Sequence, residues 1–288
     1  MNSANALDII IDAHVHLIDT QKFMYPWIEK VPAIDRSYSP EDYKAVSKDC
    51  GISKYICIEA VVAPHQSEQE MAWLEQLSLS DERLAGIVAY ANVAQGSTVE
   101  NDLERLVHTK KLKGIRFTLG KAYQKNPRLC LQKEFIEGVQ CLEKHDLSFD
   151  LAFDSDQSDD IYEFAKSCPN VQLIVNHTGK PKIADQIMQP WLGFMEKLAG
   201  LPNVSCKISD ILRDSSGKTE VNLFKPFVHK LLDLFGTRRL LFGGDFPVVT
   251  MYGSYAAQFH ILVDIFKELS NDEQQDFFCR TAQCLYRI

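Results

Sequence analysis

The stretch IIIDAHVHLID, residues 9–19, joins a run of branched apolar residues to two histidines, His14 and His16. Such runs favour buried β-strands, in which alternate side chains share one face. We therefore expect His14 and His16 to point the same way, with Asp12 below them on that face. An apolar strand with a polar end typically emerges from a core into a ligand-accessible mouth. The stretch thus predicts a buried strand that carries part of a polar site; a solvated strand end without function is the alternative.

Seven further apolar runs follow along the chain, and segments with helical spacing of apolar residues separate them. Strands that alternate with helices predict βαβ units and a parallel sheet. Eight parallel strands suggest closure, so we predict an α/β fold, a (β/α)8 TIM-type barrel, regular or distorted, with residues 1–288 as a single domain. The predicted strands are 8–16, 54–60, 84–92, 112–118, 147–153, 171–177, 203–209 and 239–245.

The predicted helices have recognisable ends. Ser39 is an N-cap candidate before Pro40 at the first helical position, and Gly51 is a stop signal. The longest irregular stretch, residues 20–38, directly follows the first strand, where a long loop is more often a lid or binding loop than a passive connection. We expect its Tyr25 and Trp27 to wall a pocket. The predicted helical segments are 39–52, 67–81, 99–111, 134–146, 158–168, 191–201, 224–236 and 255–269.

The composition is that of an ordinary globular protein, with 45% hydrophobic and 24% charged residues. A net charge of −8 argues against a general nucleic-acid binder, which would normally present a basic face to phosphates. No apolar run is long enough to span a bilayer, and residues 1–8 lack the basic and apolar regions of a signal peptide. We expect a cytoplasmic protein with no nucleic-acid or membrane partner; the sequence does not indicate an oligomeric state.

The cysteines do not suggest a redox or zinc-ribbon role. None of them form a Cys-x-x-Cys pair, and most lie in apolar helix or strand patterns. We expect reduced, buried thiols at positions 50, 57, 130, 141, 168, 206, 279 and 284.

Reactive side chains recur at the carboxyl ends of the predicted strands. In a TIM-type barrel these ends form one mouth, so residues distant in sequence converge there. Each of these residues could instead have a purely structural role, such as an ion pair between Arg116 and Glu59, a salt bridge of Lys207, or a turn capped by Asn92. Their joint occurrence favours a functional site. The set is His14, His16, Glu59, Asn92, Arg116, His177, Lys207 and Asp245.

Five segments in order resemble the amidohydrolase superfamily, in particular the branch of sugar lactonases and 2-pyrone-4,6-dicarboxylate lactonase. They are DAHVHLID (12–19), LKGIR (112–116), VNHTGKP (175–181), PNVSCKIS (202–209) and LLFGGDFPVVTMYGSY (240–255). The similarity runs nearly end to end, and the last segment with the terminal TAQCLYRI is most similar to L-fuconolactonase and L-rhamnonolactonase-like members. The resemblance implies a hydrolytic role for four motif residues, His14, His16, His177 and Asp245.

Several positions depart from the family pattern. Asn176 stands where relatives typically have Asp before the histidine, and Asp210 follows Ser209 where they have Gly. Gly244 and Phe246 flank Asp245 in place of Ser and Trp. These changes bear on substrate preference more than on catalysis. An added carboxylate at Asp210 would repel a dicarboxylate substrate unless it is paired.

A metal ion is the open question of the predicted site. His14, His16 and Asp245 suit one divalent ion such as Zn²⁺ or Mn²⁺. A binuclear centre is disfavoured, because the fourth strand carries Arg116 where a bridging residue is usual, and the fifth predicted strand has no histidine. An activated ester also needs less Lewis-acid help than an amide. We therefore expect a metal-independent hydrolase, with a single bound ion as the alternative.

The predicted function is hydrolysis of a small sugar-acid lactone to the open hydroxy acid. Asp245 would accept the proton of the attacking water, while imidazoles and Arg116 would donate to the oxygen on which charge develops. The alternatives are a 2-pyrone-4,6-dicarboxylate lactonase, a metal-dependent decarboxylase of the same superfamily, and a non-catalytic ligand-binding barrel. The predicted partner is a small-molecule lactone, and its expected contacts are Arg116, Glu59, Asn92, Lys207, Trp27 and Tyr25.

Overall fold

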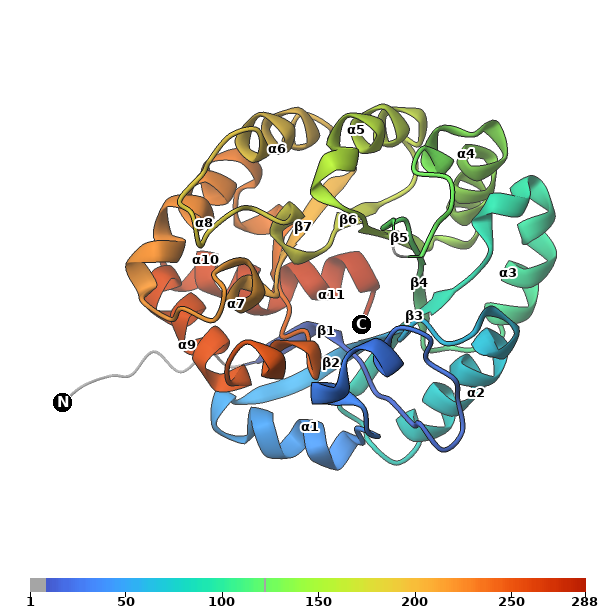
Figure 1. The fold of residues 1–288 in the computed structure, drawn as a ribbon, viewed down its shortest axis with the longest axis horizontal. Coiled ribbons are helices and arrows are strands. Elements are labelled where there is room, and N and C mark those ends of the chain that lie inside the picture. Colours follow the sequence, from blue (N-terminus) through green and yellow to red (C-terminus); the bar gives the residue numbers. More distant parts are fainter. Residues whose placement is uncertain (1–8, 122) are drawn as a thin grey trace.

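The computed structural model describes residues 9–121 and 123–288 and confirms the predicted α/β barrel. Eight parallel strands follow one another around a single sheet in chain order, and helices surround them (Figure 1). The strands are β1 (Ile10–Val15), β2 (Ile52–Ile58), β3 (Leu84–Tyr90), β4 (Leu112–Thr118), β5 (Ser148–Ala152), β6 (Leu173–Val175), β7 (Val204–Ile208) and β8 (Leu240–Phe242).

Eight of the described helices lie close to the predicted segments, and three further helices, at 211–214, 271–275 and 281–286, were not predicted. Ser39 caps α1 as expected, because its hydroxyl accepts from Asp42 N and the Asp42 carboxylate bonds back to Ser39 N. None of the described helices combines the length and apolar character needed to span a bilayer. The helices are α1 (Pro40–Ser47), α2 (Ser67–Ser78), α3 (Glu100–Leu106), α4 (Lys133–Gln140), α5 (Ser158–Ser167), α6 (Trp191–Ala199), α7 (Ile211–Asp214), α8 (Val221–Phe235), α9 (Tyr255–Phe266), α10 (Asn271–Gln275) and α11 (Thr281–Tyr286).

Some strands are shorter than predicted, and the differences fall at the site. The predicted first strand begins at Asp8, which lies outside the described residues. β6 ends before His177, which opens a short 3-10 turn, and β8 ends three residues before Asp245. Both His177 and Asp245 have positive φ angles, 53° and 55°, which a continuing strand cannot adopt.

Within the described residues, β8 and β1 are joined through the segments at their carboxyl ends. His14 O accepts from Asp245 N at 2.7 Å, and Phe246 O accepts from His16 N at 2.7 Å. Val15 and Phe246 form the corresponding parallel bridge. The contacts that join β8 to β1 are therefore made by the segments that carry His14, His16 and Asp245.

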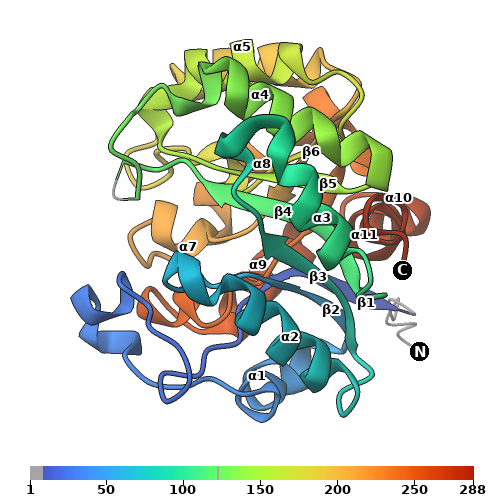
Figure 2. The ribbon, with the colours of Figure 1, turned by 90° about the vertical axis from the view of Figure 1, so that its right-hand side faces the viewer.

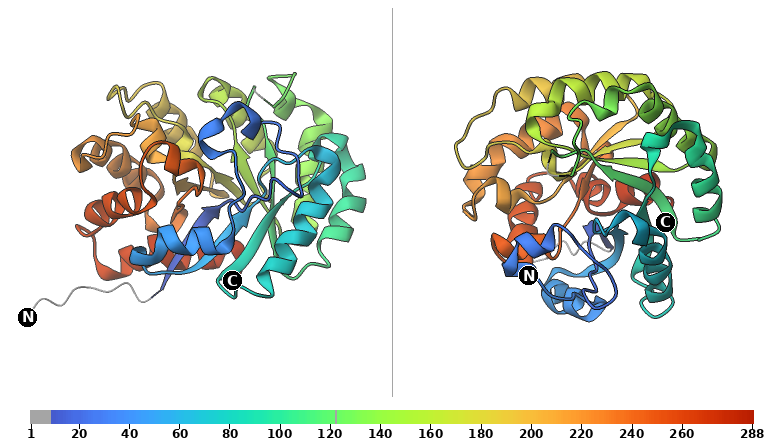
Figure 3. Two further views of the ribbon diagram at one scale, coloured as in Figure 1. Left: turned by 60° about the horizontal axis from the view of Figure 1, so that its bottom comes forward. Right: turned by 45° about the vertical axis from the view of Figure 1, so that its right-hand side comes forward.

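The amino-terminal end of the barrel is closed by α11. Apolar side chains from the strands, among them Ile11 and Ile174, pack against Ala282 and Tyr286 of this helix. Tyr286 donates to Asp150 Oδ1 at 3.1 Å, and Asp150 pairs with Lys207 in a wholly buried ion pair. In Figures 2 and 3 the segment after β1 and the helix α11 lie at opposite ends of the barrel. The mouth of the barrel thus lies at the end that carries the long loop after β1.

Asp12 does not share the face of the two histidines, contrary to the expectation from strict alternation. The pairing of β1 with β2 is irregular between Asp12 and Val15, and the Asp12 carboxylate points to α1 and α9. Its Oδ2 accepts from Tyr43 at 2.9 Å and from Tyr255 at 2.7 Å, and its Oδ1 accepts from Gly244 N at 2.7 Å. Asp12 therefore ties the first strand to the segment before Asp245.

Cys206 illustrates the predicted role of the thiols. It is fully buried in β7, and burial raises the pKa of its thiol. Cys206→Ser is expected to lower the free energy of unfolding by about 1–3 kcal/mol, because a hydroxyl replaces an apolar contact in the core. Turnover should stay within about twofold. Chemical unfolding and kcat measured together check this, with Cys284→Ser at an exposed position as the control. A folded but inactive Cys206→Ser protein would assign the thiol a chemical role.

Candidate active site

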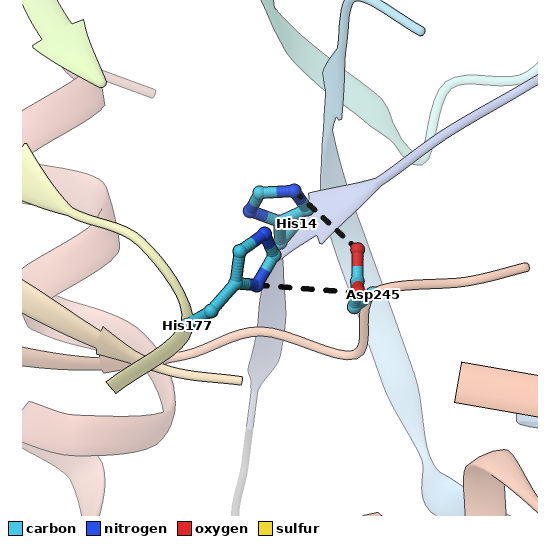
Figure 4. A group of neighbouring side chains, drawn as sticks. All are labelled: His14, His177 and Asp245. Carbon is cyan, nitrogen blue, oxygen red and sulfur yellow. Dashed lines mark ion pairs between the residues drawn. The ribbon is translucent and has the colours of Figure 1, made fainter. Parts of the chain in front are cut away.

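The site forms where the ends of β1, β6 and β8 meet. Asp245 Oδ1 lies 3.5 Å from His14 Nε2 and 3.5 Å from His16 Nε2, and these two nitrogens are 3.2 Å apart. His177 completes the group, with its Nδ1 4.0 Å from Asp245 Oδ2. Figure 4 shows His14, from β1, and His177, from the turn after β6, turned toward Asp245. The structure thus brings together all four residues predicted to act in hydrolysis.

Backbone conformation directs these side chains into the mouth. Positive φ angles recur where chain segments leave the strands, at Val61, His177, Asp210 and Asp245. Such angles are uncommon for residues other than glycine and typically accompany functional sites. Gly244 allows the close approach before Asp245, since a Cβ there would lie 2.4 Å from Asp12 Oδ2 and 2.2 Å from a Tyr255 ring carbon. Packing therefore requires a glycine at position 244, where the family pattern has Ser.

The imidazoles are held neutral. Ile58 O can only accept, so His16 Nδ1 carries the hydrogen and donates to it at 2.9 Å. In the neutral ring this leaves a lone pair on Nε2, which faces Asp245. Burial lowers the pKa of His16 to about 3 and that of His14 and His177 well below the usual value. Burial likewise raises the pKa of Asp245 to about 7, against the opposing effect of Arg213 and Arg116.

A cavity of about 260 Å³ opens directly above this group. His16, His177 and Asp245 line it together with Arg116 and Trp27. The Trp27 ring is fixed, because Nε1 donates to Ala60 O at 2.8 Å. The loop after the first strand thus supplies a wall of the mouth, as predicted.

Arg116 enters the cavity with a fixed orientation. Its Nε donates to Glu59 Oε1 at 2.6 Å and its Nη2 to Glu59 O, whereas Nη1 makes no hydrogen bond within the described residues. Glu59 Oε2 also accepts from Val61 N at 2.7 Å, and Glu59 lines a neighbouring cavity rather than the central one. Glu59 therefore positions Arg116, and Arg116 presents its free nitrogen to a ligand.

Besides Glu59, three residues predicted to contact substrate do not line the central cavity. Lys207 lies inside the barrel, fully buried against Asp150. Asn92 is exposed at the start of a 3-10 turn and borders a separate surface cavity. Tyr25 is buried in the loop, where its hydroxyl accepts from Asp19 N at 3.0 Å. Position near a strand end does not distinguish the mouth from the layer below it or from the outer rim, so the sequence could not show that these side chains lie away from the cavity.

Other polar residues of the cavity were not predicted as ligands. Lys180 lies in the VNHTGKP segment and pairs with Asp154 at 3.0 Å. Arg213 lines the cavity and pairs with the buried Asp210 at 2.7 Å. A cation three residues after Asp210 was the available signal for Arg213, since i,i+3 residues meet on a helical turn. Asn176 also lines the cavity and is 2% exposed.

The fold and the site together define a TIM-barrel hydrolase, in which histidine and carboxylate side chains gather at the carboxyl ends of the strands. The family model described as Amidohydrolase matches residues 11–288, and the chain belongs to this family. The resemblance predicted from the five sequence segments is confirmed.

Named relatives lie within this family. An L-fucono-1,5-lactonase from Burkholderia ambifaria is 24% identical, with 96% of this chain and 95% of the relative covered. A 4-sulfomuconolactone hydrolase from Rhizobium radiobacter is also 24% identical, over 82% of this chain and 75% of the relative. A solved amidohydrolase from Burkholderia multivorans, with bound zinc, is 25% identical and has a TM-score of 0.86, with 97% and 99% of the two chains covered.

The expectation of a metal-independent enzyme is wrong. A similar solved structure holds zinc, and His14, His177 and Asp245 offer ligand atoms that all lie within 4.8 Å of one another. Their chemistry fits an ion, because tetrahedral ligands at ~2.0–2.1 Å from zinc lie about 3.3 Å apart, and Asp245 Oδ1 is buried without a hydrogen-bond partner among the described residues. The absence of a second set of ligands disfavours two ions but does not bear on one.

Proposed function

We propose that this protein hydrolyses a small, uncharged sugar-acid lactone to the open hydroxy acid. The observation that carries the proposal is the convergence of Asp245 with three neutral imidazoles at the base of a cavity of about 260 Å³. The cavity suits a single small ring. Relatives named for lactone hydrolysis agree with the prediction of a hydrolase that acts on cyclic esters.

The residues of the chain divide the chemistry among them. Asp245 would accept the proton of the attacking water through its carboxylate. Arg116 would donate from Nη1 to the carbonyl oxygen on which negative charge develops. One divalent ion held by His14, His177 and Asp245, with His16 Nε2 facing the same point, would polarise the carbonyl and acidify water when bound.

The charges of the cavity favour an uncharged substrate. Arg116, Lys180 and Arg213 bring positive charge to the wall, but each already has an acidic partner. A dicarboxylate would have to compete with these partners, because each buried carboxylate needs its own charge-assisted hydrogen bonds. The hydroxyl groups of a sugar lactone can form hydrogen bonds without displacing these acidic partners. The Trp27 ring offers an apolar face for a sugar ring.

A panel of lactones with a pH indicator tests this function. We expect kcat/KM for an L-fuconolactone- or L-rhamnonolactone-like compound to exceed that for 2-pyrone-4,6-dicarboxylate. Acid release distinguishes hydrolysis from decarboxylation, which consumes a proton from the medium. A clear preference for the dicarboxylate would show that Lys180 and Arg213 exchange their partners for the substrate. No turnover of any lactone, with binding retained, would favour a ligand-binding barrel.

Arg116→Ala tests the same assignment from the protein side. We expect kcat/KM to fall at least ~10-fold for every lactone that is hydrolysed, because a donor to the reacting oxygen is lost. Arg105→Ala, at an exposed position with its own acidic partners, is the matched control and should be silent. Unchanged kinetics in Arg116→Ala would remove this residue from the reaction.

A further inference from the structure

The side chain of Asn176 has no evident structural task. Asn176 directly follows β6 and is 2% exposed, yet neither its Nδ2 nor its Oδ1 finds a hydrogen-bond partner within residues 9–121 and 123–288. Its backbone does hold the strand end, since Asn176 N donates to Leu151 O at 3.1 Å and Asn176 O accepts from Gly179 N at 3.2 Å. Buried amides are nearly always paired, so an unpaired one needs an explanation.

The surroundings of this amide point to a ligand. Asn176, His177 and Asp245 all line the central cavity. His177 Nδ1 lies 4.0 Å from Asp245 Oδ2. The other buried side-chain amides in the described part of the chain are paired. Gln258, for example, donates from Nε2 to Gly244 O at 2.7 Å and accepts at Oε1 from Ile211 N at 3.0 Å. The unpaired donor and acceptor thus occur at the wall where substrate would lie.

The chemistry of an amide defines what it would bind. Nδ2 donates and Oδ1 accepts, so a group that can do both at one place satisfies it most fully. A hydroxyl next to a carbonyl has this character, whereas a carboxylate only accepts and would leave Oδ1 unpaired. Asn176 adjoins His177 in the chain, and both line one cavity with Asp245. The substrate hydroxyl that would fall nearest to this amide is the one on the carbon next to the lactone carbonyl.

We propose that Asn176 is a specificity-determining residue that binds the 2-hydroxyl of the lactone through its side-chain amide. This inference rests on the proposed lactone hydrolysis and narrows its substrate class to 2-hydroxylactones. It also assigns a consequence to a departure from the family pattern. An aspartate at this position would only accept and would add a charge near Asp245, whereas the neutral amide offers a donor as well.

The experiment compares a 2-hydroxylactone with its 2-deoxy analogue in wild type, Asn176→Ala and Asn176→Leu. We expect kcat/KM for the 2-hydroxy compound to fall at least ~10-fold in both variants, while the value for the 2-deoxy compound changes less than about twofold, so that discrimination between the two substrates is lost. The thermal midpoint should stay the same or rise, because an unpaired buried amide is removed.

Asn203→Ala is the matched control. It removes two hydrogen bonds away from the cavity, so the thermal midpoint should fall while discrimination between the two lactones is kept. A similar loss on both lactones in the Asn176 variants, or a lowered thermal midpoint with discrimination intact, would overturn the inference and leave Asn176 a structural residue. Failure of the wild type to hydrolyse any lactone would instead overturn the proposed function.

Discussion

Replacing Asp245 with asparagine is expected to lower kcat at least ~10²-fold with the fold intact, since the amide keeps the shape of the carboxylate but cannot accept the proton of water. The backbone contact that closes the barrel, from Asp245 N to His14 O, is unaffected by this change. The variant should also bind a divalent ion more weakly, because a charged oxygen ligand becomes neutral.

Steady-state kinetics and metal content, measured with circular dichroism as a check on folding, test this expectation. Asp233→Asn is the matched control, because Asp233 is exposed and its ion-pair partner among residues 9–121 and 123–288 is Lys230, at 3.6 Å. Near-wild-type turnover in Asp245→Asn would exclude Asp245 as the base, even if its metal content fell.

Removal of the ion is expected to have an effect of similar size. Chelation followed by dialysis should take the protein from about one bound ion per chain to none and lower kcat at least ~10²-fold, because a Lewis acid contributes several kcal/mol to stabilising the developing charge. Adding Zn²⁺ or Mn²⁺ should restore both metal content and turnover. His177→Ala should bind the ion more weakly, since one of three ligands is lost.

The metal content of the His177→Ala protein is measured directly by elemental analysis, so the result does not depend on knowing the substrate. His229→Ala, at a half-buried position of α8 where the histidine pairs with Glu268, is the control and should retain the ion. A purified protein that is free of metal and fully active would contradict this prediction and show that Asp245 and Arg116 suffice for hydrolysis.

The sequence was sufficient to predict the barrel and the centre of its site. Alternating strand and helix signals gave the order of the sheet, and the polar ends of β1, β6 and β8 converge as a parallel barrel requires. The sequence did not show how deep in the barrel a side chain lies or which way it points. Lys207 and Arg116 both lie in strands, but one faces Asp150 inside the barrel and the other reaches the cavity. Periodicity alone cannot tell these layers apart.

The remaining differences trace to local backbone conformation. The ligand cluster depends on Asp245 leaving its strand at φ 55°, and the cavity position of Arg213 follows a turn in which Asp210 has φ 56°. Left-handed angles at residues other than glycine have no clear sequence signal, because tertiary contacts impose them. The irregularity of β1 that turns Asp12 toward Tyr43 and Tyr255 is of the same kind.

The position of α11 against the amino-terminal end of the barrel also bears on when the barrel can finish folding during synthesis. All eight strands precede this helix in the chain, yet the buried Asp150 takes a hydrogen bond from Tyr286 within it. A nascent chain on the ribosome therefore exposes the floor of its barrel, with its charged pair still open to water, until the last of these segments emerges. Final consolidation must follow synthesis of α11, and chaperones have that interval in which to act.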